Sequence, residues 1–360
     1  TNLRTNQDQV TKMVELMTKQ SILLILIAIA NAFTSQTLKH SNRKSNAITK
    51  LNADLITFDL DDTIFPVAPV VQDANAALIS HLHGIGYGEI SQESLIASTK
   101  LIRGELSTID KVITYTELRK RAIRMEIDRY ELHQRTNADL TERYFTDLVT
   151  KAYDVWEENR HLAAEKYLYH DAISMLEKLR SEYPNATIGA ITNGKGNPLM
   201  MKDTLCDLFD FCVSGEDDDV FPHRKPHEGI YNVALQRYKD LLHLEGDDNI
   251  CLTKDDDRIC WIHIGDDLAN DVGASAKCGA LAIWVDLSSK EYDQTASARF
   301  KENTLNKNDV NNNEKQPFWS TASSDEVEKR KKLNKKAFKF VSAKIEKLSS
   351  LPDAIRGLLD

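Results

Sequence analysis

The chain has 360 residues and a formal net charge of -9 at neutral pH, and its isoelectric point is near 5.6. This acidic balance excludes the basic field on which binding to a nucleic-acid backbone depends, so we expect no nucleic-acid partner. The length allows about two domains, and the hydrophobic content of 41% indicates that part of the chain is tail or loop rather than core.

Residues 1–51 have the composition of a targeting presequence. The apolar run from Ile22 to Ile29 is too short to span a bilayer comfortably, and small residues follow it at Ala30 and Ala32, where a signal peptidase would cleave. From Phe33 to Lys50 the chain has no acidic residue and is rich in Ser, Thr, Asn and Lys, as organelle transit peptides are. This arrangement resembles the two-part presequences of algae with secondary plastids.

We therefore expect residues 1–51 to be disordered or removed, and the mature protein to lie in a plastid (chloroplast) without stable membrane association. Because the chain begins with Thr, the residues before Met13 or Met17 are expected to lie upstream of the true start. The alternatives are that the segment is a frayed amphipathic helix and that the protein is cytoplasmic.

Beyond residue 52 short apolar strands alternate with helical stretches, and this alternation predicts a parallel α/β sheet that is doubly wound and Rossmann-like. Ligands of such sheets bind at the carboxyl ends of the strands, where Asp59, Thr192 and Asp266 fall. The predicted elements of the core are the strands Leu55–Phe58, Thr187–Ile191, Phe211–Ser214, Cys260–Ile264 and Ala280–Val285, a charged helix from Ser324 to about Phe340, a strand at Ala343–Ile345 and a helix from Leu351.

The segment between the first two strands is too long for a single crossover helix. Residues 66–168 show helical periodicity and no convincing strand, so we predict an inserted α-helical cap there. The core then consists of residues 52–65 and 169–360, with the polar residues 288–316 as a flexible insertion. The predicted cap helices are Val70–His83, Glu93–Leu106, Tyr115–Thr136 and Ala138–Arg160.

Acidic clusters follow two of the predicted strands, around Asp59 and around Asp266. Carboxylates so close together at the end of a buried strand repel one another unless a cation lies among them. Magnesium prefers oxygen ligands in octahedral geometry, and it commonly takes one or two carboxylates together with waters and a substrate phosphate. We therefore predict a Mg2+ cofactor held by Asp59 and Asp266, with the backbone carbonyl of Asp61 as a third ligand.

The same residues suit phosphoryl transfer. A carboxylate at a strand tip is held rigidly enough to attack phosphorus, and we predict that Asp59 does so and forms an aspartyl-phosphate. Asp61 is predicted to protonate the leaving alkoxide and later to take a proton from the attacking water. The negative charge on the phosphate oxygens must also be neutralised. We expect the phosphate to be bound by Thr192 and Asn193, at the start of a glycine-containing loop, and by the ammonium of Lys225.

These segments occur in a fixed order: Asp59-Leu60-Asp61-Asp62-Thr63, Ile191-Thr192-Asn193-Gly194, Lys225-Pro226, and Gly265-Asp266-Asp267 with Asn270-Asp271. They resemble all four motifs of the haloacid dehalogenase-like (HAD) hydrolases, over about residues 54–288 and a closing segment near 343–356. The resemblance implies the HAD core fold and the roles given above, and it implies that Asp271 holds a metal-bound water or Lys225. The additional acids Asp62 and Asp267 are expected to cap the following turn or helix.

The second aspartate of the first motif separates activities in this superfamily. A halide leaving group needs no general acid, so Asp61 favours phosphate chemistry over dehalogenation. The sequence of the cap does not indicate which phosphate ester is the substrate. Five cap residues are candidates for facing the cleft, although an exposed or packed helix face is the position expected for each: Arg103, Arg121, Arg124, Tyr144 and Trp156.

Longer stretches favour one branch of the superfamily. They resemble the flavin mononucleotide (FMN) phosphatases and their plant-type plastid relatives, which implies a small phosphorylated metabolite as the partner: FMN or the ribitylaminouracil phosphate of riboflavin synthesis. The alternatives are phosphoglycolate or a nucleoside monophosphate as substrate, a phosphomutase, and a non-catalytic binding protein that keeps the HAD fold. The stretches are Phe58–Phe65, Ala190–Pro198, Gly215–His227 and His263–Gly273.

Overall fold

The structure is a computed structural model, and it describes residues 52–109, 111–134, 141–244, 259–287, 292 and 324–360. These residues belong to one compact unit that begins at Leu51. The predicted presequence lies outside the described residues, as does the predicted insertion apart from Tyr292. None of the described helices is long and apolar enough to cross a membrane.

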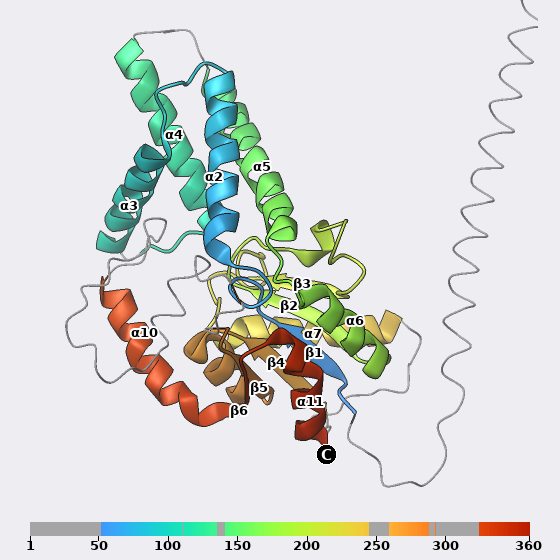
Figure 1. Cartoon of the computed structure of the whole chain (residues 1–360). Coiled ribbons are helices and arrows are strands. Elements are labelled where there is room, and N and C mark those ends of the chain that lie inside the picture. Colours follow the sequence, from blue (N-terminus) through green and yellow to red (C-terminus); the bar gives the residue numbers. More distant parts are fainter. Residues whose placement is uncertain (1–51, 110, 135–140, 245–258, 288–291, 293–323) are drawn as a thin grey trace, which may run out of the picture. The chain divides into compact units, whose positions relative to one another are not determined.

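A sheet of six parallel strands forms the centre of this unit, in the order β3-β2-β1-β4-β5-β6 (Figure 1). In the register of the sheet, Phe58 of β1 lies between Ala190 of β2 and Ile264 of β4. The predicted α/β fold is therefore confirmed, and the strand bounds agree with the prediction to within about two residues. The strands are β1 (Leu55–Phe58), β2 (Thr187–Thr192), β3 (Phe211–Ser214), β4 (Trp261–Gly265), β5 (Leu281–Val285) and β6 (Val341–Ile345).

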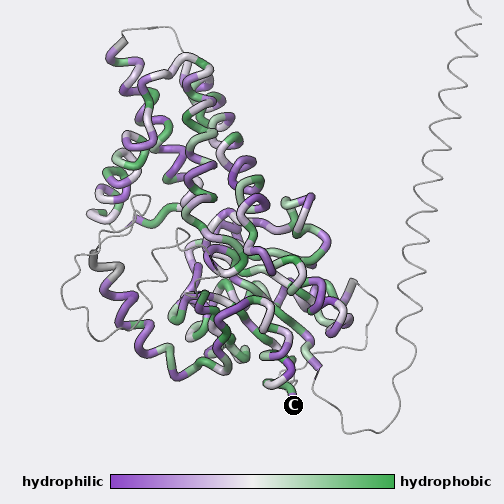
Figure 2. Tube along the Cα trace, in the orientation of Figure 1, coloured by the Kyte–Doolittle hydropathy of each residue, from purple (hydrophilic) through white to green (hydrophobic). Residues whose placement is uncertain are grey.

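Helices cover both faces of the sheet because successive strand residues point to opposite sides. Ile56 and Phe58 belong to the apolar cluster shared with α6 (Ala172–Glu182) and α11 (Leu351–Leu359). Leu55 belongs to the cluster of the other face, where α7 (Glu228–Leu244) and α8 (Ala274–Lys277) pack. The central strands β1, β2, β4 and β5 are accordingly buried along nearly their whole length, whereas the helices alternate between hydrophobic and hydrophilic residues (Figure 2). Each buried aliphatic side chain contributes about 1.5–3 kcal/mol, so the strand ends are firmly held.

The cap consists of four helices between β1 and β2, of which α2 and α5 lie side by side (Figure 1). Their shared core contains Leu78, Ile123 and Trp156. One prediction was wrong in extent: the last helix continues beyond Arg160 to Lys166, because the intervening Leu, Ala and Glu residues all favour helix. The cap helices are α2 (Val67–Gly84), α3 (Gln92–Thr108), α4 (Tyr115–Gln134) and α5 (Glu142–Lys166).

Helix α10 (Ser324–Ala337) packs on η2 (Leu268–Gly273), the helical turn that follows β4. The Oδ1 atom of Asn334 accepts a hydrogen bond from the backbone N–H of Ala269 at 3.0 Å, and Arg330 forms an ion pair with Asp267. The predicted charged helix therefore supports the loop that carries the second acidic cluster.

A buried amide ties the cap helices together. The Oδ1 atom of Asn75 on α2 accepts hydrogen bonds from Arg119 on α4 and from the indole N–H of Trp156 on α5, both at 2.9 Å. We predict that Asn75→Leu lowers the free energy of unfolding by about 1–3 kcal/mol for each donor left unsatisfied, as measured by urea unfolding. Asp73→Ala, on the same helix, removes an exposed ion pair with Lys166 and should have little effect; equal losses in the two variants would contradict this role.

Candidate active site

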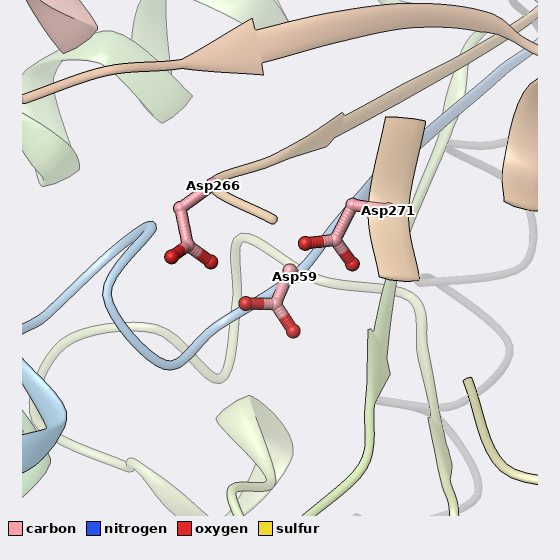
Figure 3. Close-up of side chains that lie close together, drawn as sticks. All are labelled: Asp59, Asp266 and Asp271. Atoms are coloured by element: carbon pink, nitrogen blue, oxygen red, sulfur yellow. The ribbon is translucent and has the colours of Figure 1, made fainter. Parts of the chain in front are cut away.

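Three aspartates meet at the carboxyl ends of β1 and β4. Asp59 follows β1, Asp266 follows β4 and Asp271 lies in η2, and their carboxylates point toward one another (Figure 3). All three side chains are buried, and one carboxylate oxygen of each lies within 4.8 Å of the others. The sheet register explains the meeting, because the N–H of Asp59 donates to the carbonyl of Ile264 at 2.8 Å and so aligns the two strand ends.

The ammonium of Lys225 joins this cluster. Its Nζ donates hydrogen bonds to Asp59 Oδ1 at 2.5 Å, to Asp271 Oδ1 at 2.8 Å and to the carbonyl of Ile191 at 2.8 Å. Burial alone would lower the pKa of Lys225, but the Asp271 and Asp59 carboxylates outweigh it and hold this pKa above its usual value. Lys225 is therefore charged and fully hydrogen-bonded.

One ammonium does not neutralise three buried carboxylates. Burial raises the pKa of Asp59 to about 7, with the charges of Asp271 and Asp61 adding to the rise and Lys225 opposing it. Asp271 behaves differently: burial would raise its pKa, but Lys225 and His263 hold that pKa below its usual value. The cluster therefore holds more carboxylates than ammonium groups, and its buried, all-oxygen donor set fits a hard divalent cation such as magnesium.

Thr63 links two of the aspartates. Its Oγ1 accepts a hydrogen bond from the backbone N–H of Asp266 at 3.1 Å and donates to Asp59 Oδ2 at 3.3 Å. Sequence reasoning missed this role, although a buried hydroxyl four residues after Asp59 is a usable signal.

The loop after β2 holds the phosphate-binding candidates. Thr192 is buried, and its hydroxyl accepts from the N–H of Gly194 at 3.2 Å. The side-chain amide of Asn193 donates to the carbonyl of Lys225 at 2.9 Å and accepts from the N–H of that residue at 2.8 Å. In this structure the Asn193 side chain positions Lys225, and direct phosphate binding by Thr192 and Asn193 stays a prediction.

Asp61 meets a residue that sequence reasoning missed. Its Oδ1 accepts a hydrogen bond at 2.8 Å from Nη2 of Arg160, which lies on cap helix α5 and is only 3% exposed. The usable signal is periodicity, because Tyr153, Trp156 and Arg160 recur at helical spacing on the buried face of α5. An arginine on an apolar stripe indicates a partner, and here the partner is the predicted acid/base.

Other cap candidates have different partners. Arg121 pairs with Glu117, and Arg124 pairs with Asp128 and Glu142. The Trp156 indole is part of the cap core, and Tyr144 is exposed. These placements favour a structural or surface position for the four residues.

The loop that carries Lys225 also contacts the cap. The two carboxylate oxygens of Glu216 accept hydrogen bonds from the backbone N–H groups of Tyr115 and Thr116, each at 2.8 Å, at the start of α4. The guanidinium of Arg224 donates to the carbonyl of Ile113 at 3.2 Å and stacks over the Tyr115 ring. Glu216 thereby satisfies the N-terminal N–H groups of a cap helix from the core.

The additional acids have capping roles, as expected. Asp62 Oδ1 accepts from the N–H of Val67 at the start of α2 at 2.9 Å. Asp267 Oδ1 accepts from the N–H groups of Ala269 and Asn270 at 2.9 and 2.8 Å. Asp62 has a φ of 64°, a left-handed conformation that Asp tolerates better than most residues.

Comparison with known proteins identifies the family. The model of the haloacid dehalogenase-like hydrolases matches residues 53–279, which is well over half of the chain. The chain therefore belongs to the haloacid dehalogenase-like hydrolase family, as its motifs predicted. None of the curated proteins matches it.

Solved structures resemble this chain at low identity. A 2-haloacid dehalogenase from Pseudomonas syringae pv. Tomato DC3000 is 21% identical, with a TM-score of 0.52 over 84% of this chain and 98% of that one. A putative HAD-hydrolase from Bacillus subtilis, bound to magnesium, is 15% identical, with a TM-score of 0.41 over 84% and 98%. A HAD phosphatase from Thermococcus onnurineus is 16% identical, with a TM-score of 0.38 over 84% and 97%.

Proposed function

We propose that this protein is a magnesium-dependent phosphomonoesterase. The observation that carries the proposal is the second carboxylate, Asp61, which lies close enough to influence the pKa of Asp59 and is oriented by Arg160. A carboxyl group in this place, in its protonated form, supplies the proton that an alkoxide leaving group needs and a halide does not. Membership of the family indicates a hydrolase, and the presence of Asp61 favours phosphate esters as its substrates.

The chemistry divides between the two carboxylates. An oxygen of Asp59 attacks phosphorus, the bond from phosphorus to the ester oxygen breaks, and Asp61 gives its proton to the departing alkoxide. Asp61 then accepts a proton from water, whose oxygen attacks phosphorus and releases phosphate from Asp59. Lys225 and the loop after β2 neutralise the phosphate oxygens.

Magnesium would be held by Asp59, Asp266 and the backbone carbonyl of Asp61. When bound, it neutralises charge on the phosphate oxygens and on the cluster itself. Asp271 is engaged with Lys225 and would orient that ammonium rather than bind the metal directly. The buried, all-oxygen donor set of the cluster supports this assignment.

For the substrate we propose FMN or the ribitylaminouracil phosphate of riboflavin synthesis, in a plastid. The support is the resemblance of the segments around all four motifs to that branch, together with the composition of residues 1–51. Phosphoglycolate and nucleoside monophosphates are the alternative substrates. A non-catalytic binding protein is the alternative of another class, although Asp59, Asp61 and Lys225 are all present.

The role of Asp61 predicts a dependence on the leaving group. Asp61→Asn should lower kcat/KM for an alkyl phosphate by about 100- to 10,000-fold, because the alkoxide then leaves without a proton. The loss should be much smaller for 4-nitrophenyl phosphate, whose leaving group is stable as an anion. Steady-state kinetics of wild type and variant on both esters measure this, and an equal loss on both would exclude the acid role.

The acidic cluster predicts a magnesium-dependent stability. Magnesium at about 100 times its dissociation constant should add about 2.7 kcal/mol to the free energy of unfolding, as measured by chemical unfolding with and without the ion. Asp266→Asn should abolish most of this gain. Asp203→Asn changes an exposed acid and should retain it; the same gain in both variants would place magnesium elsewhere.

The substrate proposal predicts the order of activities. FMN and the ribitylaminouracil phosphate should exceed phosphoglycolate, nucleoside monophosphates and 2-chloropropionate in kcat/KM, with Asp59→Asn as the inactive control. A higher kcat/KM for phosphoglycolate or nucleotides would contradict the proposed substrate. Release of halide without phosphatase activity would contradict the proposed reaction class. Binding of these esters without turnover of any of them would favour the non-catalytic alternative.

A further inference from the structure

Only one of the two terminal nitrogens of the Arg160 guanidinium has a hydrogen-bond partner in the described part of the chain. Nη2 donates to Asp61, but Nη1 is buried and has no hydrogen-bond partner. Buried polar groups are nearly always hydrogen-bonded, and leaving a charged donor unpaired is costly. A tie between cap and core would explain the bond to Asp61, but it does not explain the second, unpaired nitrogen.

Two glycines of the loop after β2 leave room for this guanidinium. A Cβ atom at Gly196 would lie 2.9 Å from Arg160 Nη1, and one at Gly194 would lie 3.7 Å from Nη2 and 3.5 Å from Asp61 Oδ2. Neither glycine has a positive φ, so the backbone conformation does not require glycine at either position. Their small size places the Arg160 guanidinium between the acid/base and the loop predicted to bind phosphate.

Neighbouring contacts fix the end of α5 in this place. His161 Nε2 donates to the carbonyl of Lys195 at 3.1 Å, and Lys195 Nζ lies 3.7 Å from Glu157 Oε1. Consecutive residues of α5, Arg160 and His161, therefore both lie against residues 194–196 of this loop. The unpaired Nη1 faces a loop whose expected ligand is an anion, and a guanidinium binds phosphate oxygens well.

We propose that Arg160 is a phosphate-contacting residue supplied by the cap: Nη2 positions Asp61, and Nη1 binds an oxygen of the substrate's phosphate group. This inference rests on the proposed phosphatase function and adds a residue to its site. The cap then helps to bind the phosphate group, which all substrates share, in addition to selecting the alcohol part of the ester.

The test is the binding of inorganic phosphate to the full chain with magnesium present, measured by calorimetry, because it requires no turnover. Arg160→Met should weaken phosphate binding about 10- to 100-fold. Arg160→Lys should recover part of this loss, because an ammonium is a point charge that cannot serve both Asp61 and phosphate as a planar fork does. Arg121→Met, which removes the same charge from the cap surface, should leave binding unchanged.

A second variant covers the case in which Arg160→Met fails to fold. Gly196→Ala keeps every charge but places a methyl group against Nη1, and it should also weaken phosphate binding. The double variant should bind phosphate no more weakly than Arg160→Met alone, because both changes act on one contact.

The outcomes separate the two proposals. Folded Arg160→Met and Gly196→Ala variants that bind phosphate like wild type would overturn the role of Arg160 while leaving the phosphatase intact. A wild-type protein that hydrolyses no phosphate ester and binds no phosphate would overturn the proposed function itself. A loss of kcat/KM on alkyl phosphates in Arg160→Met that exceeds the loss on 4-nitrophenyl phosphate would support the positioning of Asp61.

Discussion

The burial of carboxylates at the ends of two adjacent parallel strands is the constraint on which the rest of the site depends. Asp59 and Asp266 are brought together by the pairing of β1 with β4, and both side chains are buried. Such a cluster is unfavourable unless each charge is compensated. Lys225, Thr63 and the N–H groups around them provide part of that compensation, and a divalent cation suits the remainder.

This constraint explains why the sequence predicted so much of the site. Parallel strands place the residues that follow them at one edge, so Asp59, Thr192 and Asp266 had to lie near one another once the strands were recognised. Arg160 could not be placed in the same way, because its position depends on how far α5 extends and on which loop its end contacts. Helical spacing marked it as inward-facing, but no local pattern indicated Asp61 as its partner.

The cap contacts the core at the loops that carry Asp61 and Lys225, in addition to the loop after β2. Arg160 contacts the loop of Asp61, while Glu216 and Arg224, in the same loop as Lys225, contact the start of α4. Asp59 and Asp266 are held by the sheet instead. The predicted nucleophile and the acidic cluster are therefore fixed by the core, whereas the orientation of the predicted proton donor depends on the position of the cap.

The loop after β4 shows how elements outside the motifs contribute to the site. The carboxylates of Asp266 and Asp271 can lie within 4.8 Å of each other only if the turn between them keeps its shape. The N–H groups of Asp271 and Val272 both donate to the carbonyl of Asp267 within that turn. Arg330 and Asn334 of α10 hold the same turn from outside. A helix with no catalytic residue thus helps to set the spacing of the acids, because carboxylates that repel one another stay together only where the backbone between them is rigid.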